Sequence, residues 1–157
     1  MTTQEMSVLG AQPFLRGMPA DQLARLAELC THVSVPAGQR LFEEGSKADK
    51  FWIIDAGQVA LDAIVPGRGR LIIERLGRKD VIGLSWMMPP YQWHYGAITT
   101  QAMQAYEFDV PAVRAACEAD PVLGFELSRR FSAIALHRLQ ATRIKLLEAC
   151  AQPEMRN

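Results

Sequence analysis

Short apolar runs separated by glycine-containing turns fill the middle of the chain, over residues 33–108. Residues 59–65, VALDAIV, follow the two-residue period of a β-strand. Residues 66–69, PGRG, predict a turn, and residues 71–73 predict the returning strand of a hairpin. Residues 97–108 supply further strand material. We therefore predict an antiparallel β-roll over residues 33–108.

The segment before this region has helical spacing instead. A helix is predicted over about residues 19–31, where Pro19 suits the first turn and Leu23, Leu26 and Cys30 fall on one face. We accordingly assign residues 14–32 as helical. Residues 1–13 are interpreted as an N-terminal extension.

Helical spacing returns after the β-rich region, over residues 109–150. Asp109 and Asp120 can each cap a helix, and Pro121 suits a first helical position. The second helix runs to about Cys150, and residues 151–157 form a polar tail. Its apolar stripe is wider than one helix needs to sit on a barrel, and it comprises Leu123, Leu127, Phe131, Ile134, Ala135, Leu139, Leu146 and Leu147. This stripe has two interpretations. It is buried within one subunit, or it forms the seam of a homodimer, and we favour the homodimer.

The most informative segment is residues 36–59, PAGQRLFEEGSKADKFWIIDAGQV, in which Gly38, Gly45 and Gly57 interrupt two apolar strands at turn-like spacing. This order resembles the opening of the cyclic-nucleotide-binding domain family, and the resemblance extends over about residues 14–147. It implies a mainly β fold with flanking helices: a double-stranded β-helix or jelly-roll barrel followed by a long C-terminal helix.

The resemblance also implies where a ligand would bind. In the family, a phosphate-binding cassette consists of a glycine, a glutamate, a short helix, and an arginine followed by small residues. Residues 81–102 occupy this place, and Gly83 matches the cassette glycine, with the amides of Gly83, Leu84 and Ser85 available to an anion. Leu84 replaces the glutamate, Gly96 falls at the arginine, and Ala97 falls at the small residue. Residues 80–113 contain no Lys or Arg at all, so the usual anchors are absent.

An aromatic and proline-rich run, residues 86–95, stands between these positions. In one interpretation Trp93 stacks on a ligand ring and His94 supplies a donor or positive charge. In the other, the aromatic side chains fill the vacated space, and we favour this packing role for Trp86 and the methionines. For Trp93 and His94 both interpretations stay open.

A second match lies on the last helix, at residues 139–142, LQAT. In the catabolite-activator branch of the family, the threonine at this position reaches the purine of the bound nucleotide. The resemblance therefore implies that Thr142 and the following Arg143 contact any ring that binds. The alternative is a threonine on a dimer seam beside a solvated arginine.

Composition narrows the remaining possibilities. The 157 residues carry 17 Lys and Arg against 17 Asp and Glu, so the net charge of zero does not favour a nucleic-acid binder. We find no membrane-spanning run or signal pattern and expect a cytoplasmic location. Cys30, Cys117 and Cys150 are interpreted as reduced thiols in helices. No catalytic or metal-ligand spacing appears, so we expect neither an enzyme nor a metal site.

These observations together favour a stand-alone regulatory sensor of small molecules with an atypical cassette. The ligand class it allows is a cyclic nucleotide or another small anion. The alternative is a ligand-free interaction module that retains only the fold. In both cases we expect a homodimer, an effector protein as the route of output, and no direct DNA binding, because only residues 151–157 follow the last helix.

Overall fold

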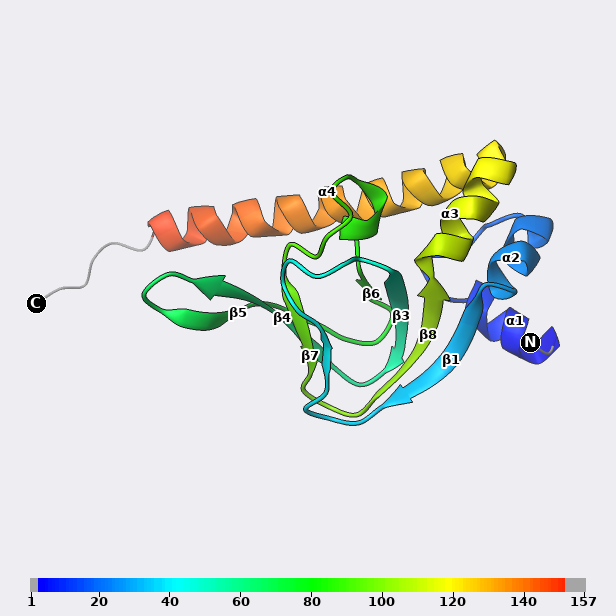
Figure 1. The fold of residues 1–157 in the computed structure, drawn as a ribbon. Helices are drawn as coiled ribbons and strands as arrows, with labels where there is room; N and C mark the ends of the chain where they lie inside the picture. Colours follow the sequence, from blue (N-terminus) through cyan, green and yellow to red (C-terminus); the bar gives the residue numbers. More distant parts are fainter. Residues whose placement is uncertain (1–2, 152–157) are drawn as a thin grey trace, which may run out of the picture.

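The computed structural model describes residues 3–151 and consists of two β-sheets flanked by helices (Figure 1). The strands are β1 (Cys30–Val35), β2 (Arg40–Phe42), β3 (Lys50–Ala56), β4 (Val59–Val65), β5 (Gly69–Leu76), β6 (Val81–Ile82), β7 (Gly96–Thr99) and β8 (Met103–Asp109). The helices are α1 (Thr3–Gly10), α2 (Ala20–Ala27), the single 3₁₀ turn η1 (Ser85–Met87), α3 (Val110–Ala119) and α4 (Pro121–Ala151). No described helix is both long enough and apolar enough to cross a membrane.

Each sheet has four strands, in the orders β1-β8-β3-β6 and β2-β7-β4-β5. Every pairing is antiparallel, and strands distant in sequence lie side by side, as β1 and β8 do. The predicted mainly β jelly roll is thereby confirmed. The two sheets face each other without closing into one continuous barrel.

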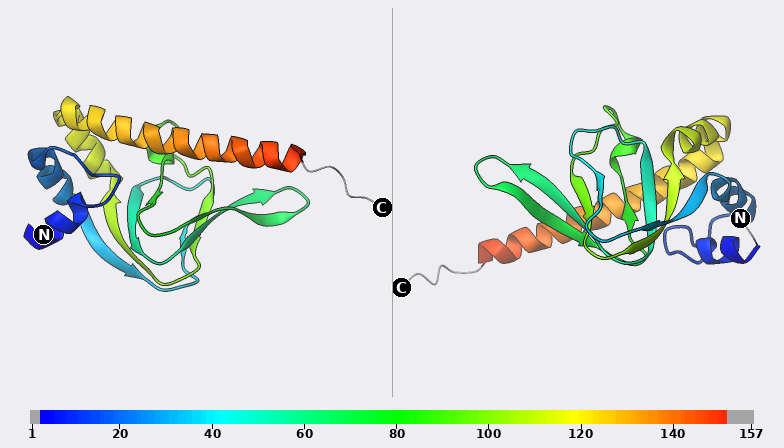
Figure 2. Two further views of the ribbon diagram at one scale, coloured as in Figure 1. Left: turned by 180° about the vertical axis from the view of Figure 1, so that it is seen from behind. Right: turned by 60° about the horizontal axis from the view of Figure 1, so that its bottom comes forward.

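The hairpin predicted from the strand at residues 59–65 and the returning strand at residues 71–73 is also confirmed, and its second strand extends to Leu76. Strands β4 and β5 pair from Val59 opposite Leu76 to Val65 opposite Gly69, with a bulge between Leu61 and Asp62. The hairpin projects from the sheets in the same general direction as the C-terminal half of α4 (Figures 1 and 2). Several side chains of this hairpin are therefore not covered by the rest of the described chain.

Strand β3 separates two parts of the core because its side chains alternate between two faces. On one face the ring of Phe51 stacks on Phe108 and meets Phe131 of α4 edge-on. On the other face Trp52 stacks on Phe42 of the second sheet. The first face therefore packs against the helices and the second forms the interior between the sheets.

The N-terminal predictions need correction. Residues 3–10, which the sequence assigned to an N-terminal extension, form the helix α1, and Leu9 is fully buried in the core. The helix predicted over 19–31 ends at Ala27, and Cys30 begins β1 opposite Phe108. Cys30 is therefore a strand residue rather than a helical one. Burial raises the pKa of its thiol to about 11.

The C-terminal helices begin as predicted. The carboxylate of Asp109 accepts a hydrogen bond from the amide of Ala112, and that of Asp120 accepts one from the amide of Val122. Helix α4 then continues over 31 residues to Ala151, which agrees with the long helix expected to end near Cys150. The predicted tail lies outside the described residues from position 152 onward.

Candidate functional site

The cassette glycine, Gly83, follows β6 with a left-handed backbone (φ +101°). A Cβ atom at this position would lie 2.9 Å from Cη2 of Trp93 and 3.2 Å from both the carbonyl oxygen of Lys50 and Cβ of Phe51. Glycine is therefore required here by backbone conformation and by space. The volume directly beside it is occupied by the Trp93 indole.

Trp93 is a packed residue, with only 4% of its surface exposed. Its ring stacks on Phe42 at a centroid distance of 3.8 Å, and Trp52 completes the group at 6.2 Å. The backbone of Trp93 is held as well, because its amide donates to the Ser46 carbonyl and its carbonyl accepts from the Gly45 amide, both at 2.8 Å. These contacts favour the interpretation in which Trp93 fills the space beside Gly83.

Trp86 is also part of the core, in agreement with the packing role favoured for it. From η1 its ring stacks on Phe51 and meets Phe131 of α4 edge-on. Its carbonyl accepts a hydrogen bond of 2.7 Å from Arg114, whose guanidinium also lies over the ring of Tyr91. The cassette is thus packed directly onto the long helix.

The remaining residues of the cassette loop differ in exposure. Leu84 is partly buried and packs against the core. Ser85 Oγ and His94 Nδ1 lie 3.0 Å apart within hydrogen-bonding distance, and the His94 side chain is exposed. The structure therefore brings Ser85 and His94 together at the surface, away from the buried indole of Trp93.

Gly96 does not contribute to the space beside Gly83. Ala97 is fully buried in the core opposite Leu61 of β4, and since neighbouring side chains alternate, Gly96 faces outward opposite Asp62. A Cβ at Gly96 would lie 2.4 Å from Asp62 Oδ1 and 2.9 Å from Arg40 Nη1. A side chain at Gly96 would thus meet the charged groups of Asp62 and Arg40 rather than Gly83.

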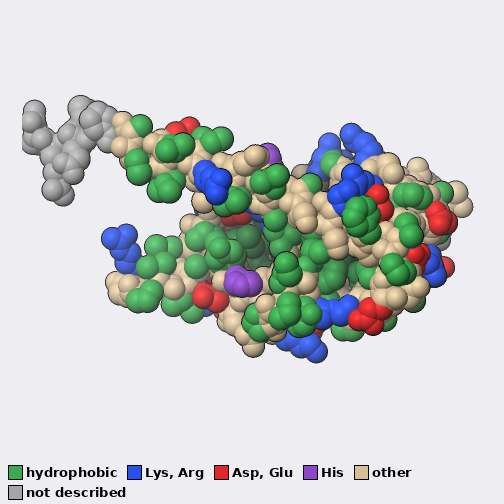
Figure 3. Space-filling view, turned by 90° about the horizontal axis from the view of Figure 1, so that it is seen from above, with side chains coloured by type: hydrophobic (Ala, Val, Ile, Leu, Met, Phe, Trp, Pro, Cys, Tyr) green, Lys and Arg blue, Asp and Glu red, His purple; other side chains and the backbone are tan. Residues whose placement is uncertain are grey.

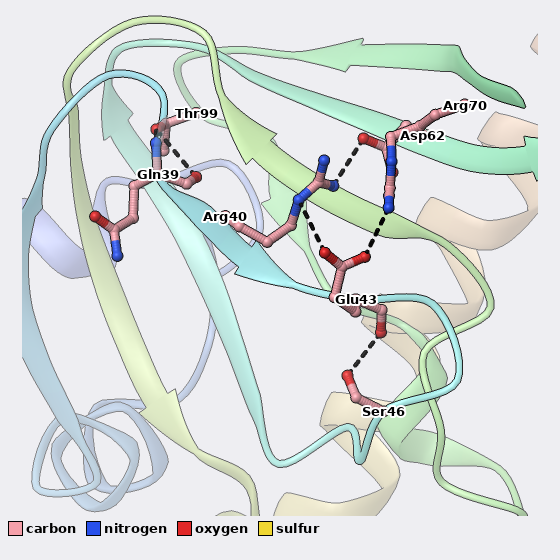
Figure 4. Close-up of polar contacts among 7 residues, drawn as sticks. All are labelled: Gln39, Arg40, Glu43, Ser46, Asp62, Arg70 and Thr99. Carbon is pink, nitrogen blue, oxygen red and sulfur yellow. Dashed lines mark hydrogen bonds and ion pairs between the residues drawn. The ribbon is translucent and has the colours of Figure 1, made fainter.

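This outer face carries an ionic cluster of Arg40, Glu43, Asp62 and Arg70 that sequence reasoning missed (Figure 4). The Asp62 carboxylate is 3% exposed and accepts hydrogen bonds from Arg40 Nη1 at 2.7 Å and Arg70 Nη1 at 2.9 Å. Glu43 pairs with both arginines at 3.5 and 3.1 Å. Two carboxylates thus neutralise two guanidinium groups across strands β2, β7, β4 and β5.

We expect Asp62→Asn to lower the free energy of unfolding by about 2 kcal/mol, because it weakens two charge-assisted hydrogen bonds to a buried group. Glu43→Gln is the matched control, and since Glu43 is half exposed it should cost less than about 1 kcal/mol. Urea denaturation of both variants measures the difference. Equal losses would show that burial of Asp62 adds nothing to its pairs.

The two helix positions, Thr142 and Arg143, are exposed on α4. The Thr142 hydroxyl donates a hydrogen bond of 2.9 Å to the carbonyl of Arg138, within the same helix. Among residues 3–151, no hydrogen bond links either residue to the cassette. Their proposed contact with a ligand ring stays a prediction.

The helix residue that does reach the cassette strand is Arg138. Its guanidinium donates to the carbonyl of Val81 on β6 and lies 4.0 Å from the carboxylate of Glu74 on β5. Burial lowers the pKa of Arg138 below its ordinary value. The sequence offered one signal for it, since Arg138 lies four residues before Thr142 and hence on the same face of the helix.

Two cavities of about 340 Å³ each border other parts of the roll, and neither is lined by Gly83, Leu84 or Gly96. One lies between β2, β3 and β8, and the other lies between Tyr91 and α3. Within the described residues, no group of three or more His, Cys, Asp or Glu is placed to hold a metal ion. Directly beside the cassette glycine, the nearest side-chain atom to a would-be Cβ is Cη2 of Trp93.

Comparisons with known proteins agree with this architecture. Residues 32–120 match the model of the cyclic nucleotide-binding domain. The chain is 23% identical over 141 residues to the CRP-like cAMP-activated global transcriptional regulator of Mycobacterium tuberculosis, and the match covers 90% of this chain and 61% of that protein. The chain thus spans less than two thirds of this relative.

Solved structures show the same fold. A putative cyclic nucleotide-binding protein from Geobacter metallireducens superposes with a TM-score of 0.78 and 24% identity, covering 88% of this chain and 99% of that one. A cyclic nucleotide-binding domain from Methylobacillus flagellatus also gives 0.78, at 16% identity, covering 96% and 84%. The match over residues 32–120 includes strands β2 to β8 and the cassette, and the chain belongs to the cyclic nucleotide-binding domain family.

Proposed function

We propose that this domain is a regulatory interaction module whose cassette does not hold a cyclic nucleotide. The observation that carries the proposal is the Trp93 ring, which lies against Gly83 and is stacked on Phe42. An anion that approached the backbone of Gly83 would have to displace a buried indole from its aromatic neighbours. This is the second of the two functions that the sequence left open.

The distribution of positive charge supports the same proposal. Arg40 and Arg70 are paired with carboxylates on the outer face of the sheet, and Arg138 is engaged by Val81 and Glu74. Arg114, which contacts the cassette loop, is likewise engaged by the carbonyl of Trp86 and the ring of Tyr91. Output then passes through an effector protein, and the neutral net charge favours a protein partner in the cytoplasm over DNA.

We expect neither cyclic AMP nor cyclic GMP to bind at micromolar concentration. Two charge-assisted hydrogen bonds are absent, and at roughly 1.5–3 kcal/mol each their loss lowers affinity a hundredfold or more. Isothermal titration calorimetry on the wild-type protein makes the measurement. Saturable micromolar binding would contradict the proposal.

The double variant Leu84→Glu with Gly96→Arg provides a second arm of this test. It restores the two residue types of the family cassette, but a side chain at position 96 would meet Asp62 and Arg40 on the outer face. We therefore expect no gain in nucleotide binding from the folded double variant. A gain would show that position 96 can reach the cassette after all.

A sensor is the second candidate, and one observation favours it. Ser85 and His94 face each other at the exposed end of the cassette loop, 3.0 Å apart. A hydroxyl and an imidazole in this arrangement can together contact an anion at the surface. Binding of inorganic phosphate that is lost in His94→Ala would favour this function over the module.

We further propose a homodimer formed through α4. From residue 134 onward the helix leaves large apolar side chains exposed within the described chain, namely Leu136, Leu139, Ile144, Leu146 and Leu147. The hairpin β4–β5 exposes Ile64, Leu71, Ile72 and Ile73. Seen from above, apolar side chains line both the C-terminal half of α4 and this hairpin (Figure 3). An exposed apolar surface of this kind is typical of an interface.

We expect Leu139→Glu to yield a monomer, because a carboxylate on the seam would be buried against apolar side chains of the second copy. Val122→Glu is the control, since Val122 is exposed near the other end of the same helix. Sedimentation velocity at micromolar concentration compares the two. The seam is excluded if the wild type sediments as a monomer or if both variants stay dimeric.

A further inference from the structure

A cleft of about 340 Å³ opens between the two sheets, beside β2, β3 and β8. The buried rings of Trp52 and Trp93 and the partly buried ring of Phe42 lie along its apolar wall. No residue of α4 and none of the cassette residues Gly83, Leu84 and Ser85 lines it. The cleft therefore adjoins the cassette only through Trp93, and its apolar wall depends on Trp93 keeping the packed position described above.

The polar wall of the cleft is unusual for the interior of a roll. Trp52 and Glu107 are directly paired and share the inner face, and Lys50 lies on that face two residues before Trp52. Positions on an inner face are normally apolar, and this ion pair lies at the open side of the cleft, where the side chains of Lys50 and Glu107 are 44% and 21% exposed. Lys50 Nζ lies 2.5 Å from Glu107 Oε1, and the Trp52 indole donates to Oε2 at 2.8 Å.

Lysine donors remain available in the cleft. Both carboxylate oxygens of Glu107 are engaged, whereas the Lys50 ammonium has three donors and uses one of them on Glu107. Lys47 also lines the cleft, is exposed, and forms no ion pair with any residue in the range 3–151. Arg40, which also lines the cleft, is already paired with Asp62 and Glu43, and Asp49 contributes a second carboxylate. Lys47 and Lys50 are therefore the two groups in the lining with which an anionic ligand could pair.

We infer that this cleft binds a small organic anion with a flat apolar body. The anionic group would pair with Lys47 and Lys50, and the body would lie along the wall formed by Phe42 and Trp93. The volume is at the lower end of the usual range for ligand pockets, roughly 300–1,000 Å³, which restricts the ligand to a compact molecule.

Benzoate is a suitable probe, followed through the indole N–H resonances of Trp52 and Trp93 by NMR. We expect saturable shifts with a dissociation constant on the order of 1 mM. Benzamide, the neutral isostere, should bind about tenfold more weakly because it lacks the charge. Lys47→Met should weaken benzoate binding by a similar factor, whereas Lys145→Met, on the exposed part of α4, should leave it unchanged.

Lys50→Met tests the lysine on the inner face of the sheet. If the Lys50→Met protein fails to fold, Lys47→Met still tests the inference, since Lys47 is exposed. The inference is overturned if benzoate, at concentrations well above the expected dissociation constant, shifts neither indole N–H resonance. It is equally overturned if benzamide binds as tightly as benzoate. It is also overturned if binding is unchanged in Lys47→Met. Shifts confined to the amides of residues 83–85 would place the anion in the cassette and would likewise overturn it.

Discussion

Trp93→Ala is expected to lower the free energy of unfolding by about 3–5 kcal/mol, the usual range for removing a fully packed aromatic side chain. The ring is 4% exposed and touches both Phe42 and the backbone beside Gly83. Its removal opens an apolar cavity next to the cassette. Because such cavities accept small aromatic molecules, added indole should raise the melting temperature of the variant and leave the wild type unchanged.

Two further variants make this result interpretable. Tyr95→Ala, two residues away and half exposed, should cost less than about 1 kcal/mol. Trp93→Leu retains part of the packing and serves if the alanine variant does not fold. A small loss for Trp93→Ala without any effect of indole would mean that the ring does not fill the cassette, and the interaction-module proposal would fail with it.

Gly57→Ala is expected to lower the free energy of unfolding by a similar amount, because of the backbone conformation and the close backbone contacts at this position. Gly57 joins β3 to β4 with φ +93°, and a Cβ there would lie 2.1 Å from the carbonyl oxygen of Ala102 and 2.8 Å from Cα of Met103. Left-handed strain and steric overlap together should cost about 3 kcal/mol or more, because neither contact partner is a flexible side chain. Thermal denaturation should show a drop of roughly 6–12 °C.

Gly45 provides the matched comparison, since it has φ +82° but no atom within 4 Å of its would-be Cβ. Gly45→Ala should therefore show only the conformational cost, about 1–2 kcal/mol. If the two variants lost the same stability, close approach to Ala102 would not be what requires glycine at position 57.

The parts of the fold that were predictable from the sequence depend on local signals. The hairpin over residues 59–76 follows from an alternating strand and a glycine turn, and the start of α4 follows from Asp120 and Pro121. The start of β1 was misassigned because Cys30 continues the apolar spacing of α2 by coincidence. Its partner Phe108 is 78 residues away and leaves no local signal.

The candidate site was less predictable because it depends on contacts between distant segments. Between β6 and β7 the chain forms an irregular loop, so no periodicity fixes which side chain faces inward. Trp93 and Gly96 could therefore not be distinguished by alignment alone, and the structure places only Trp93 beside Gly83. The cluster around Asp62 joins residues 22 and 8 positions apart on three strands, which only the sheet topology brings together.

The ionic cluster over Gly96 also constrains how this chain can change over evolutionary time. Any side chain at position 96 requires the side chains of Asp62 and Arg40 to shift, so a substitution there disturbs the ion pairs of the cluster. Loss of Asp62 alone, however, leaves two guanidinium groups without their buried counter-ion. Each step is harmful without the other, a case of epistasis that makes glycine at position 96 difficult to replace by single mutations.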